Sequence, residues 1–221
     1  MDQVRHLKPG KENNPGIVYL GVAPAALFKS DDYGSTWSEV VSLSEHSSRD
    51  QWQPGLSGMC LHSFVPDPSA ANGIWVGISA VGVFGTTDSG GNWNTMNQGV
   101  RADFMPDRFP DFGQCQRKVL THHAKPGLLY QQNHCGVYKS ESAGAEWQDI
   151  TGGLPSQFGF VLGLHSQDPD TLFVLPEDQV LGEDVGGGQC YVIEAKFRVY
   201  RSRNGGRDWK PLTQELPQDN A

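Results

Sequence analysis

One pattern occurs four times along the 221 residues: a short apolar strand, a polar turn that contains glycine, and then a tryptophan. The four copies are LFKSDDYGSTW, VFGTTDSGGNW, VYKSESAGAEW and VYRSRNGGRDW. Their tryptophans are Trp37, Trp93, Trp147 and Trp209, at spacings of 56, 54 and 62 residues. A repeat of that length matches the size of one blade of a β-propeller.

Each repeat has room for four short strands and shows no helical period. In the first repeat the candidates are QVRHLKP, GIVYLGV, LFKS and SEVVSL. The 27 glycines and 14 prolines fit many short elements that are joined by turns. We therefore predict an all-β fold: a β-propeller or propeller arc of about four four-stranded blades. It would be a single domain over residues 1–221, with blades at roughly 1–43, 56–98, 114–153 and 158–214.

The polar turn predicts a defined geometry. In the first copy, Asp32 can accept hydrogen bonds from the backbone N–H groups that follow it, and Gly34 can adopt a positive φ. Trp37 would insert its ring between neighbouring sheets. In the third and fourth copies Ser142 and Asn204 replace the aspartate, with a weaker hydrogen bond for serine. The positions given structural roles are Ser30, Asp32, Gly34, Trp37, Thr86, Asp88, Gly90, Trp93, Ser140, Gly144, Trp147, Ser202, Asn204, Gly206 and Trp209.

The motif S/T-x-D-x-G-x-x-W, complete in the first two turns, resembles the Asp-box or BNR repeat of sialidase-like β-propellers. The chain is similar to bacterial WD40/YVTN/BNR-like propeller proteins, often labelled exo-sialidase or glycosyl hydrolase, and looks shortened beside them. The resemblance implies a propeller fold. Sialidase activity is not implied, because the Asp-box is a surface turn remote from the sialidase active site and the family's Arg-Ile-Pro motif is missing.

The four strands of a blade, A to D, sort the connections onto two faces. The A–B and C–D turns share one face, here called the turn face, and the D–A and B–C connections share the opposite one, the loop face. The loop face carries aromatic residues interleaved with arginines and carboxylates, which suits sugars or polar metabolites. We predict a ligand site there that uses Arg49, Trp52, Arg101, Asp103, Arg108, Asn133 and His134.

The expected function is a ligand- or partner-binding module that acts through the loop face, with a carbohydrate or a protein as ligand. The alternative is a glycoside hydrolase, exo-sialidase-like or another glycosidase. Such an enzyme needs two carboxylates at the scissile bond. Asp50, Asp103 and Asp107 are the candidate catalytic residues, and Asp111 and Glu177 lie on the same face. The sequence leaves open whether the chain is an enzyme.

Charge, apolar content and cysteine spacing limit the classes of partner, compartment and cofactor that we expect. The net charge is −8 and no Lys/Arg cluster occurs, so nucleic acid and anionic membrane surfaces are not expected as partners. No apolar run reaches roughly 18 residues and no leader is visible, which makes the cytoplasm the expected compartment. The cysteines Cys60, Cys115, Cys135 and Cys190 lack metal-site spacing, so we expect thiols, no metal and no cofactor.

The fourth repeat ends near Leu212, and TQELPQDNA follows it. Three arrangements stay open: a shortened propeller, a closed four-blade ring, and an arc closed by a second copy. An open arc is expected to expose edge strands at both ends, which favour pairing with another chain. A homodimer through such open propeller edges would remove them.

Overall fold

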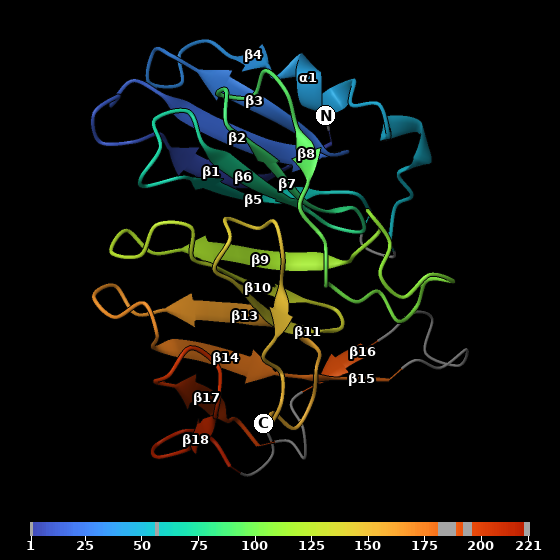
Figure 1. The fold of residues 1–221 in the computed structure, drawn as a ribbon, viewed down its shortest axis with the longest axis vertical. Helices are drawn as coiled ribbons and strands as arrows, with labels where there is room; N and C mark the ends of the chain where they lie inside the picture. Colours follow the sequence, from blue (N-terminus) through green and yellow to red (C-terminus); the bar gives the residue numbers. More distant parts are fainter. Residues whose placement is uncertain (1, 56–57, 181–188, 192–195, 219–221) are drawn as a thin grey trace.

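The computed structural model describes residues 2–55, 58–180, 189–191 and 196–218. Their strands form four antiparallel sheets of four strands each, and each sheet arises from one sequence repeat. The predicted all-β propeller arc is therefore confirmed, and its four blades follow one another from top to bottom in Figure 1. No helix of the described residues is long and apolar enough to cross a membrane.

The strands of each blade pair in chain order. Blade 1 contains β1 (Gln3–Pro9), β2 (Val18–Ala23), β3 (Ala26–Ser30) and β4 (Ser38–Glu39). Blade 2 contains β5 (Leu61–Pro66), β6 (Ile74–Ile78), β7 (Gly82–Thr86) and β8 (Asn94–Thr95). Blade 3 contains β9 (Gln116–Thr121), β10 (Leu129–Asn133), β11 (Gly136–Ser140) and β12 (Gln148–Asp149). Blade 4 contains β13 (Gly159–Leu164), β14 (Leu172–Pro176), β17 (Val199–Ser202) and β18 (Lys210–Leu212).

Three smaller elements lie in the connections. The hairpin of β15 (Asp178–Val180) and β16 (Gln189–Tyr191) is inserted between β14 and β17, and α1 (Val41–Ser44) and η1 (Arg49–Gln51) follow blade 1. All three lie at the right in Figure 1, together with the long connection from β8 to β9. The A–B turns lie at the left in Figure 1, and the order of the antiparallel strands puts the C–D turn of each blade at the same end of its sheet, which gives the turn face and the loop face as expected.

Each junction between blades has its own apolar core, because a blade of alternating residues buries one face against each neighbour. The first strands of successive blades, β1, β5, β9 and β13, contact one another along the inside of the arc. At the junction of blades 1 and 2, Tyr19 stacks on Phe64 with ring centroids 4.0 Å apart.

A glycine faces a larger residue at every junction, near the loop end of the second strand. A Cβ added at Gly21 would lie 2.4 Å from the Leu61 carbonyl oxygen, and one at Gly77 would lie 2.2 Å from Gln116 Oε1. These contacts leave no space for a side chain. Between blades 3 and 4 the order is reversed, so that the second strand supplies the large residue and the inner strand the glycine. The pairs are Gly21 with Leu61, Gly77 with Gln116, and Gln132 with Gly159.

The four C–D turns share one hydrogen-bond pattern. In the first, Ser30 Oγ accepts from the Gly34 N–H at 2.8 Å, and Asp32 Oδ1 accepts from the Thr36 N–H at 2.8 Å. In the third, Ser142 Oγ accepts the equivalent N–H, that of Glu146, at 3.0 Å. The glycines Gly34, Gly90, Gly144 and Gly206 all have φ between 87° and 94°. Such values are costly for residues with a Cβ.

The tryptophans that end these turns join neighbouring blades. The indole N–H of Trp147 donates to the Met96 carbonyl oxygen at 2.8 Å, and that of Trp209 donates to Ile150 at 2.9 Å. Trp37 departs from the prediction that it lies between sheets, since it is 37% exposed. No blade precedes blade 1 in the described structure, so its ring has no neighbouring sheet to enter.

Candidate functional site

Four rings meet on the loop face, where blades 2, 3 and 4 come together. The His134 ring lies between Phe104 and Phe158, at centroid distances of 5.4 and 4.9 Å, and Phe158 contacts Phe160 edge-on at 5.2 Å. Phe104 comes from the β8–β9 connection, His134 from the β10–β11 turn, and the other two from the start of β13. We call these four residues the aromatic cluster.

Arg117 of β9 lies over the aromatic cluster. Its guanidinium carbon is 4.5 Å from the Phe160 ring centroid and 5.6 Å from that of Phe158. Such contacts are attractive cation–π interactions. Arg117 Nε is buried and has no hydrogen-bond partner among the described residues. The site therefore holds an arginine that packs on the phenylalanine rings and whose buried Nε makes no hydrogen bond among the described residues.

A carboxyl group with altered acidity accompanies the cluster. Glu177 follows β14, and its backbone N–H donates to the Phe158 carbonyl oxygen at 2.9 Å. Burial raises the pKa of Glu177, and Arg117 opposes this in part. Burial and Arg117 both lower the pKa of His134, so this ring stays neutral at pH 7.

The outer part of the aromatic cluster is open to solvent. Phe104 is 50% exposed and Phe160 is 41% exposed, whereas Phe158 beneath them is buried. Flat rings at a surface bind the apolar faces of ligands such as sugars, while adjacent polar groups fix orientation. The arrangement offers two exposed rings to one ligand, with the Arg117 guanidinium over one of them and the Glu177 carboxyl group close enough to Arg117 to interact with it electrostatically.

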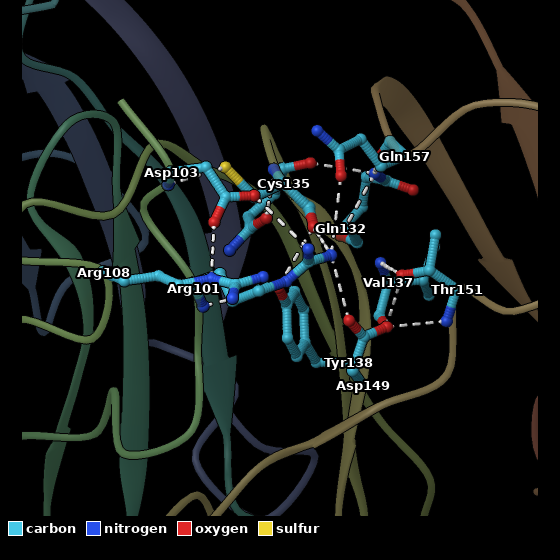
Figure 2. A network of polar contacts seen from close by, with 12 residues as sticks. Arg101, Asp103, Arg108, Gln132, Cys135, Val137, Tyr138, Asp149, Thr151 and Gln157 are labelled. Carbon is cyan, nitrogen blue, oxygen red and sulfur yellow. Dashed lines mark hydrogen bonds and ion pairs between the residues drawn. The ribbon is translucent and has the colours of Figure 1, made fainter. Parts of the chain in front are cut away.

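Arg101, one of the predicted ligand residues, instead links blade 2 to blade 3 (Figure 2). It donates to the Cys135 carbonyl oxygen at 2.6 Å and to the Tyr138 hydroxyl at 3.2 Å, and it pairs with Asp149 at 2.9 Å. Burial raises the pKa of Tyr138 to about 12, so its hydroxyl stays protonated and donates onward to Cys135 at 3.1 Å. These partners occupy the guanidinium.

Asp103 and Arg108 belong to the same network. Asp103 pairs with Arg101 at 3.3 Å and with Arg108 at 2.9 Å, and its backbone N–H donates to Cys135 Sγ at 3.4 Å. Figure 2 shows both arginines directed at this carboxylate. The three residues brace the β8–β9 connection, which in turn presents Phe104. These three residues therefore affect the aromatic cluster indirectly, because they fix the position of Phe104.

The Arg49–Trp52 segment does not join the aromatic cluster through any contact of the described residues. Trp52 is buried in the core between blades 1 and 2, and its indole donates to Ser48 Oγ at 2.8 Å. Arg49 lies 4.7 Å over that ring and donates to the Ala25 carbonyl oxygen at 2.8 Å. The geometry gives both residues packing roles, because each donates to a group of blade 1 or of the segment that follows it.

The remaining predicted residues fall in three places. Asp50 and Asp107 are exposed, and Asp107 Oδ1 accepts from the Phe109 N–H at 2.9 Å. Asn133 is buried and its Oδ1 accepts from the Cys135 N–H at 2.6 Å, which shapes the turn that carries His134. His134 is thus the predicted ligand residue that the structure puts in the aromatic cluster.

Arg117 was not among the predicted site residues. Its signal is a basic residue near the start of one inner strand, with the alternating pair Phe158 and Phe160 at the start of the next. Inner strands of successive blades are neighbours, so the two signals indicate residue types that can form a cation–π contact, although they do not fix the register that brings the two side chains together. Cys60, Cys115 and Cys135, for their part, are thiols as expected.

A groove of about 870 Å³ runs along the inner strands at the opposite end of the blades. Its lining includes Lys8, Lys11, Lys118, His6 and His123. Phe64, the phenylalanine in its lining, is buried. The groove therefore suits anions more than sugar rings.

No protein-family model matches the chain. The chain is 24% identical to an oligoxyloglucan-reducing end-specific xyloglucanase of Emericella nidulans over 227 residues, which cover 89% of this chain and 26% of that protein. It is 25% identical to a xyloglucanase of Hypocrea jecorina, over 90% of this chain and 24% of that protein. The chain thus spans about a quarter of the length of these curated relatives.

Solved structures show the same fold. An ancestral GH74 enzyme superimposes with a TM-score of 0.69 at 16% identity, over 99% of this chain and 26% of that one. The GH74 xyloglucanase of Xanthomonas campestris gives a TM-score of 0.61 at 19% identity, over 91% of this chain and 29% of that one. YCF48 from Cyanidioschyzon merolae gives 0.57 at 13% identity, over 96% and 57%. The chain has the fold of a β-propeller arc.

Proposed function

We propose that this chain binds a polysaccharide on its loop face, as part of a glycoside hydrolase-type propeller. The aromatic cluster carries the proposal. Phe104 and Phe160 give a sugar ring two exposed stacking surfaces, and the Arg117 guanidinium lies against the Phe160 ring. The sequence leaves open a carbohydrate or a protein as ligand. We favour the carbohydrate, because the curated relatives are named for a polysaccharide.

Xyloglucan is the proposed substrate class. The relatives are named xyloglucanases, and a β-linked glucan backbone presents flat, apolar sugar faces that stack on phenylalanine. The C–D turns are proposed to be Asp-boxes of the BNR type, on the strength of their shared hydrogen bonds. They lie on the turn face, so their role is structural in this scheme.

Hydrolysis is the second candidate function, and the raised pKa of Glu177 favours it. A general acid for glycoside cleavage must hold its proton near neutral pH, which burial promotes. Glu177 is then the acid that protonates the leaving oxygen, and a second carboxylate must act on the opposite side of the bond. Of the carboxylates predicted for catalysis, Asp103 is held between two arginines and is the weakest candidate.

Binding is tested by calorimetric titration of the chain with xyloglucan oligosaccharides. We expect Phe160→Ala and Phe104→Ala to weaken binding at least roughly fivefold each, through lost stacking. Phe109→Ala is the matched control, since Phe109 lies on the same connection as Phe104 and is 53% exposed outside the cluster. The proposal is contradicted if both cluster variants bind the oligosaccharides with the affinity of the parent chain, or if the parent chain does not bind them at all.

Hydrolysis is tested by release of reducing ends from the same oligosaccharides. Glu177→Gln keeps the size and removes the acidic proton, so it should abolish turnover and leave oligosaccharide affinity within about twofold. Unchanged turnover in this variant rejects Glu177 as the acid. Binding without any turnover in the parent chain rejects the second candidate function and leaves the first.

A further inference from the structure

Two sheet faces at the ends of the arc have no blade against them in the described structure. On blade 1, Leu7, Leu20 and Phe28 form one cross-strand row, and Leu7 is 60% exposed. Blade 4 likewise has an uncovered row, which consists of Val161, its partner Leu175 and the neighbouring Phe173. Val161 is 53% exposed. We call these surfaces the N-face and the C-face. They correct the expectation of open edge strands, because a propeller arc ends in sheet faces.

The N-face row is buried wherever a preceding blade exists. In blade 2 the positions of Leu20 and Phe28 are held by Val76 and Phe84, a pair in the same register, and both are 0% exposed. In blade 4 they are Val174 and Tyr200, at 1% and 8%. Blade 1 therefore carries an apolar row that is built for a neighbour.

The C-face repeats the other half of the same interface. Phe173 occupies the position from which an aromatic residue of each earlier blade reaches the next blade. Phe173 itself has no next blade to contact in the described structure. The earlier contacts are Tyr19 stacked on Phe64, Trp75 donating to the Ala143 carbonyl oxygen at 2.9 Å, and Tyr130 donating to the Pro169 carbonyl oxygen at 3.0 Å.

The indole hydrogen bonds between blades also leave an unused donor on blade 1 and an unused acceptor position on blade 4. Trp147 and Trp209 donate to Met96 and Ile150 on the outermost segment of the preceding blade. Trp93 donates instead to Ser42 Oγ of α1 at 3.2 Å, and the indole of Trp37 has no acceptor among the described residues. Leu212 pairs with Val199 as Ile150 pairs with Val137, so it presents the equivalent position at the end of blade 4.

Charge is complementary across the two faces. The C-face row of Phe173 continues through Arg201 to Lys210 in the outermost strand. The N-face row of Phe28 continues to Glu39, which is exposed. An apolar centre with a basic rim would thus meet an apolar centre with an acidic rim.

We propose that the C-face of one copy docks on the N-face of a second copy, head to tail, and that two copies close a ring of eight blades. The chain carries both halves of an interface that it already repeats at three internal junctions, so the matching occupant is this chain itself. Eight blades fall within the range of known propellers. A head-to-tail contact that closes has two identical interfaces in the dimer.

One position differs from the internal junctions. Val4 of β1 stands where Leu61, Gln116 and Gly159 stand in the later blades, and Leu175 stands where Gly21 and Gly77 do. Neither residue is a glycine. At the loop end, the two sheets of the contact between copies must therefore lie farther apart than the sheets at the internal junctions of blades 1 to 3.

The test is the solution mass of the full chain, by analytical ultracentrifugation from about 1 to 100 μM. We expect a dimer, and we expect Leu20→Asp and Phe173→Asp each to give monomers because a charge enters one half of both interfaces. Mixing the two variants should restore pairing, because the intact C-face of one meets the intact N-face of the other. Ala145→Asp places the same charge at an exposed position away from both faces and should leave the dimer intact.

Trp37→Phe is a milder variant that keeps the ring and removes the indole donor. It should raise the dimer dissociation constant about tenfold, and circular dichroism should show an unchanged fold. A parent chain that stays monomeric at all concentrations overturns the proposal. So does a dimer that survives Phe173→Asp, which means pairing of two N-faces, and so does a mass that keeps growing with concentration.

Discussion

Trp147 donates its indole N–H to the backbone carbonyl oxygen of Met96 at 2.8 Å, and this hydrogen bond joins the turn of blade 3 to the outer edge of blade 2. The tryptophan is 4% exposed and lies in the core of that junction. The bond therefore links a surface turn to the packing between blades.

We predict that Trp147→Phe lowers the free energy of unfolding by about 1–3 kcal/mol, since the Met96 carbonyl oxygen loses its partner. Trp147→Ala should cost roughly 3–5 kcal/mol, because a cavity is added. Urea denaturation followed by circular dichroism measures both. Equal stability of the alanine variant and the parent would refute the packing role of the four tryptophans.

The two arginines that contact Asp103 should behave differently on substitution. Arg101→Met should cost roughly 2 kcal/mol, because it leaves buried partners such as the Tyr138 hydroxyl without charge-assisted hydrogen bonds. Arg108→Met should change stability by less than about 1 kcal/mol, since its side chain is 59% exposed. Thermal unfolding of both variants measures the difference. Similar losses in the two would contradict the bracing role of Arg101.

Asp32 makes stability depend on pH in the acid range. Hydrogen bonds from the backbone and side chain of Thr36, and then from Ser30, lower its pKa to about 2. Its contribution is therefore full above the unfolded value of roughly 4 and is lost as the pH falls through about 2. A carbon-13 NMR titration of the carboxyl group should show a midpoint near 2.

Asp32→Asn is the matched variant for this effect. Asn204 already fills the same place in the fourth turn, where its Oδ1 accepts from the Asp208 N–H at 3.2 Å. The variant should keep the turn and unfold with a weaker dependence on pH between about 4 and 2. An unchanged dependence would mean that Asp32 is not held by these bonds.

Glu177 changes the stability with pH in the direction opposite to Asp32. Burial raises its pKa, so its contribution to folding is full below the unfolded value of roughly 4 and is lost as the pH rises through the higher folded pKa. Glu177→Gln cannot ionise. We expect the variant to gain melting temperature over the parent at pH 7 and to lose that gain near pH 4. A constant difference at both pH values would show that the carboxyl group is not perturbed.

The fold follows from the sequence because the same turn and tryptophan recur at blade-length intervals, and each copy is a local signal. The sorting of loops onto one face also follows, since it requires only the order of antiparallel strands. The prediction for Trp37 was wrong because burial of that ring depends on a neighbouring blade, which a local motif does not report.

The candidate site was harder to predict. Arg49, Arg101 and Asp103 lie on the correct face, but the sequence does not show that their charges are satisfied by backbone carbonyls and by one another. Arg117 and Phe160 face each other across two blades, 43 positions apart in the chain. Such a contact depends on how far one inner strand slides past the next, which no local pattern encodes.

The pairing of a glycine with a larger residue at each junction has a consequence for the order of the blades. Blades 1 and 2 offer a glycine, Gly21 or Gly77, to the blade that follows, whereas blade 3 offers Gln132 and is received by Gly159. A recombinant chain with a copy of blade 2 in the third place would set Gly77 against Gly159 and leave a hole. A copy of blade 3 in the second place would drive Gln132 into Gln116. The repeats of this chain are therefore not interchangeable modules, and gene duplication or blade shuffling would have to change both partners of a junction together.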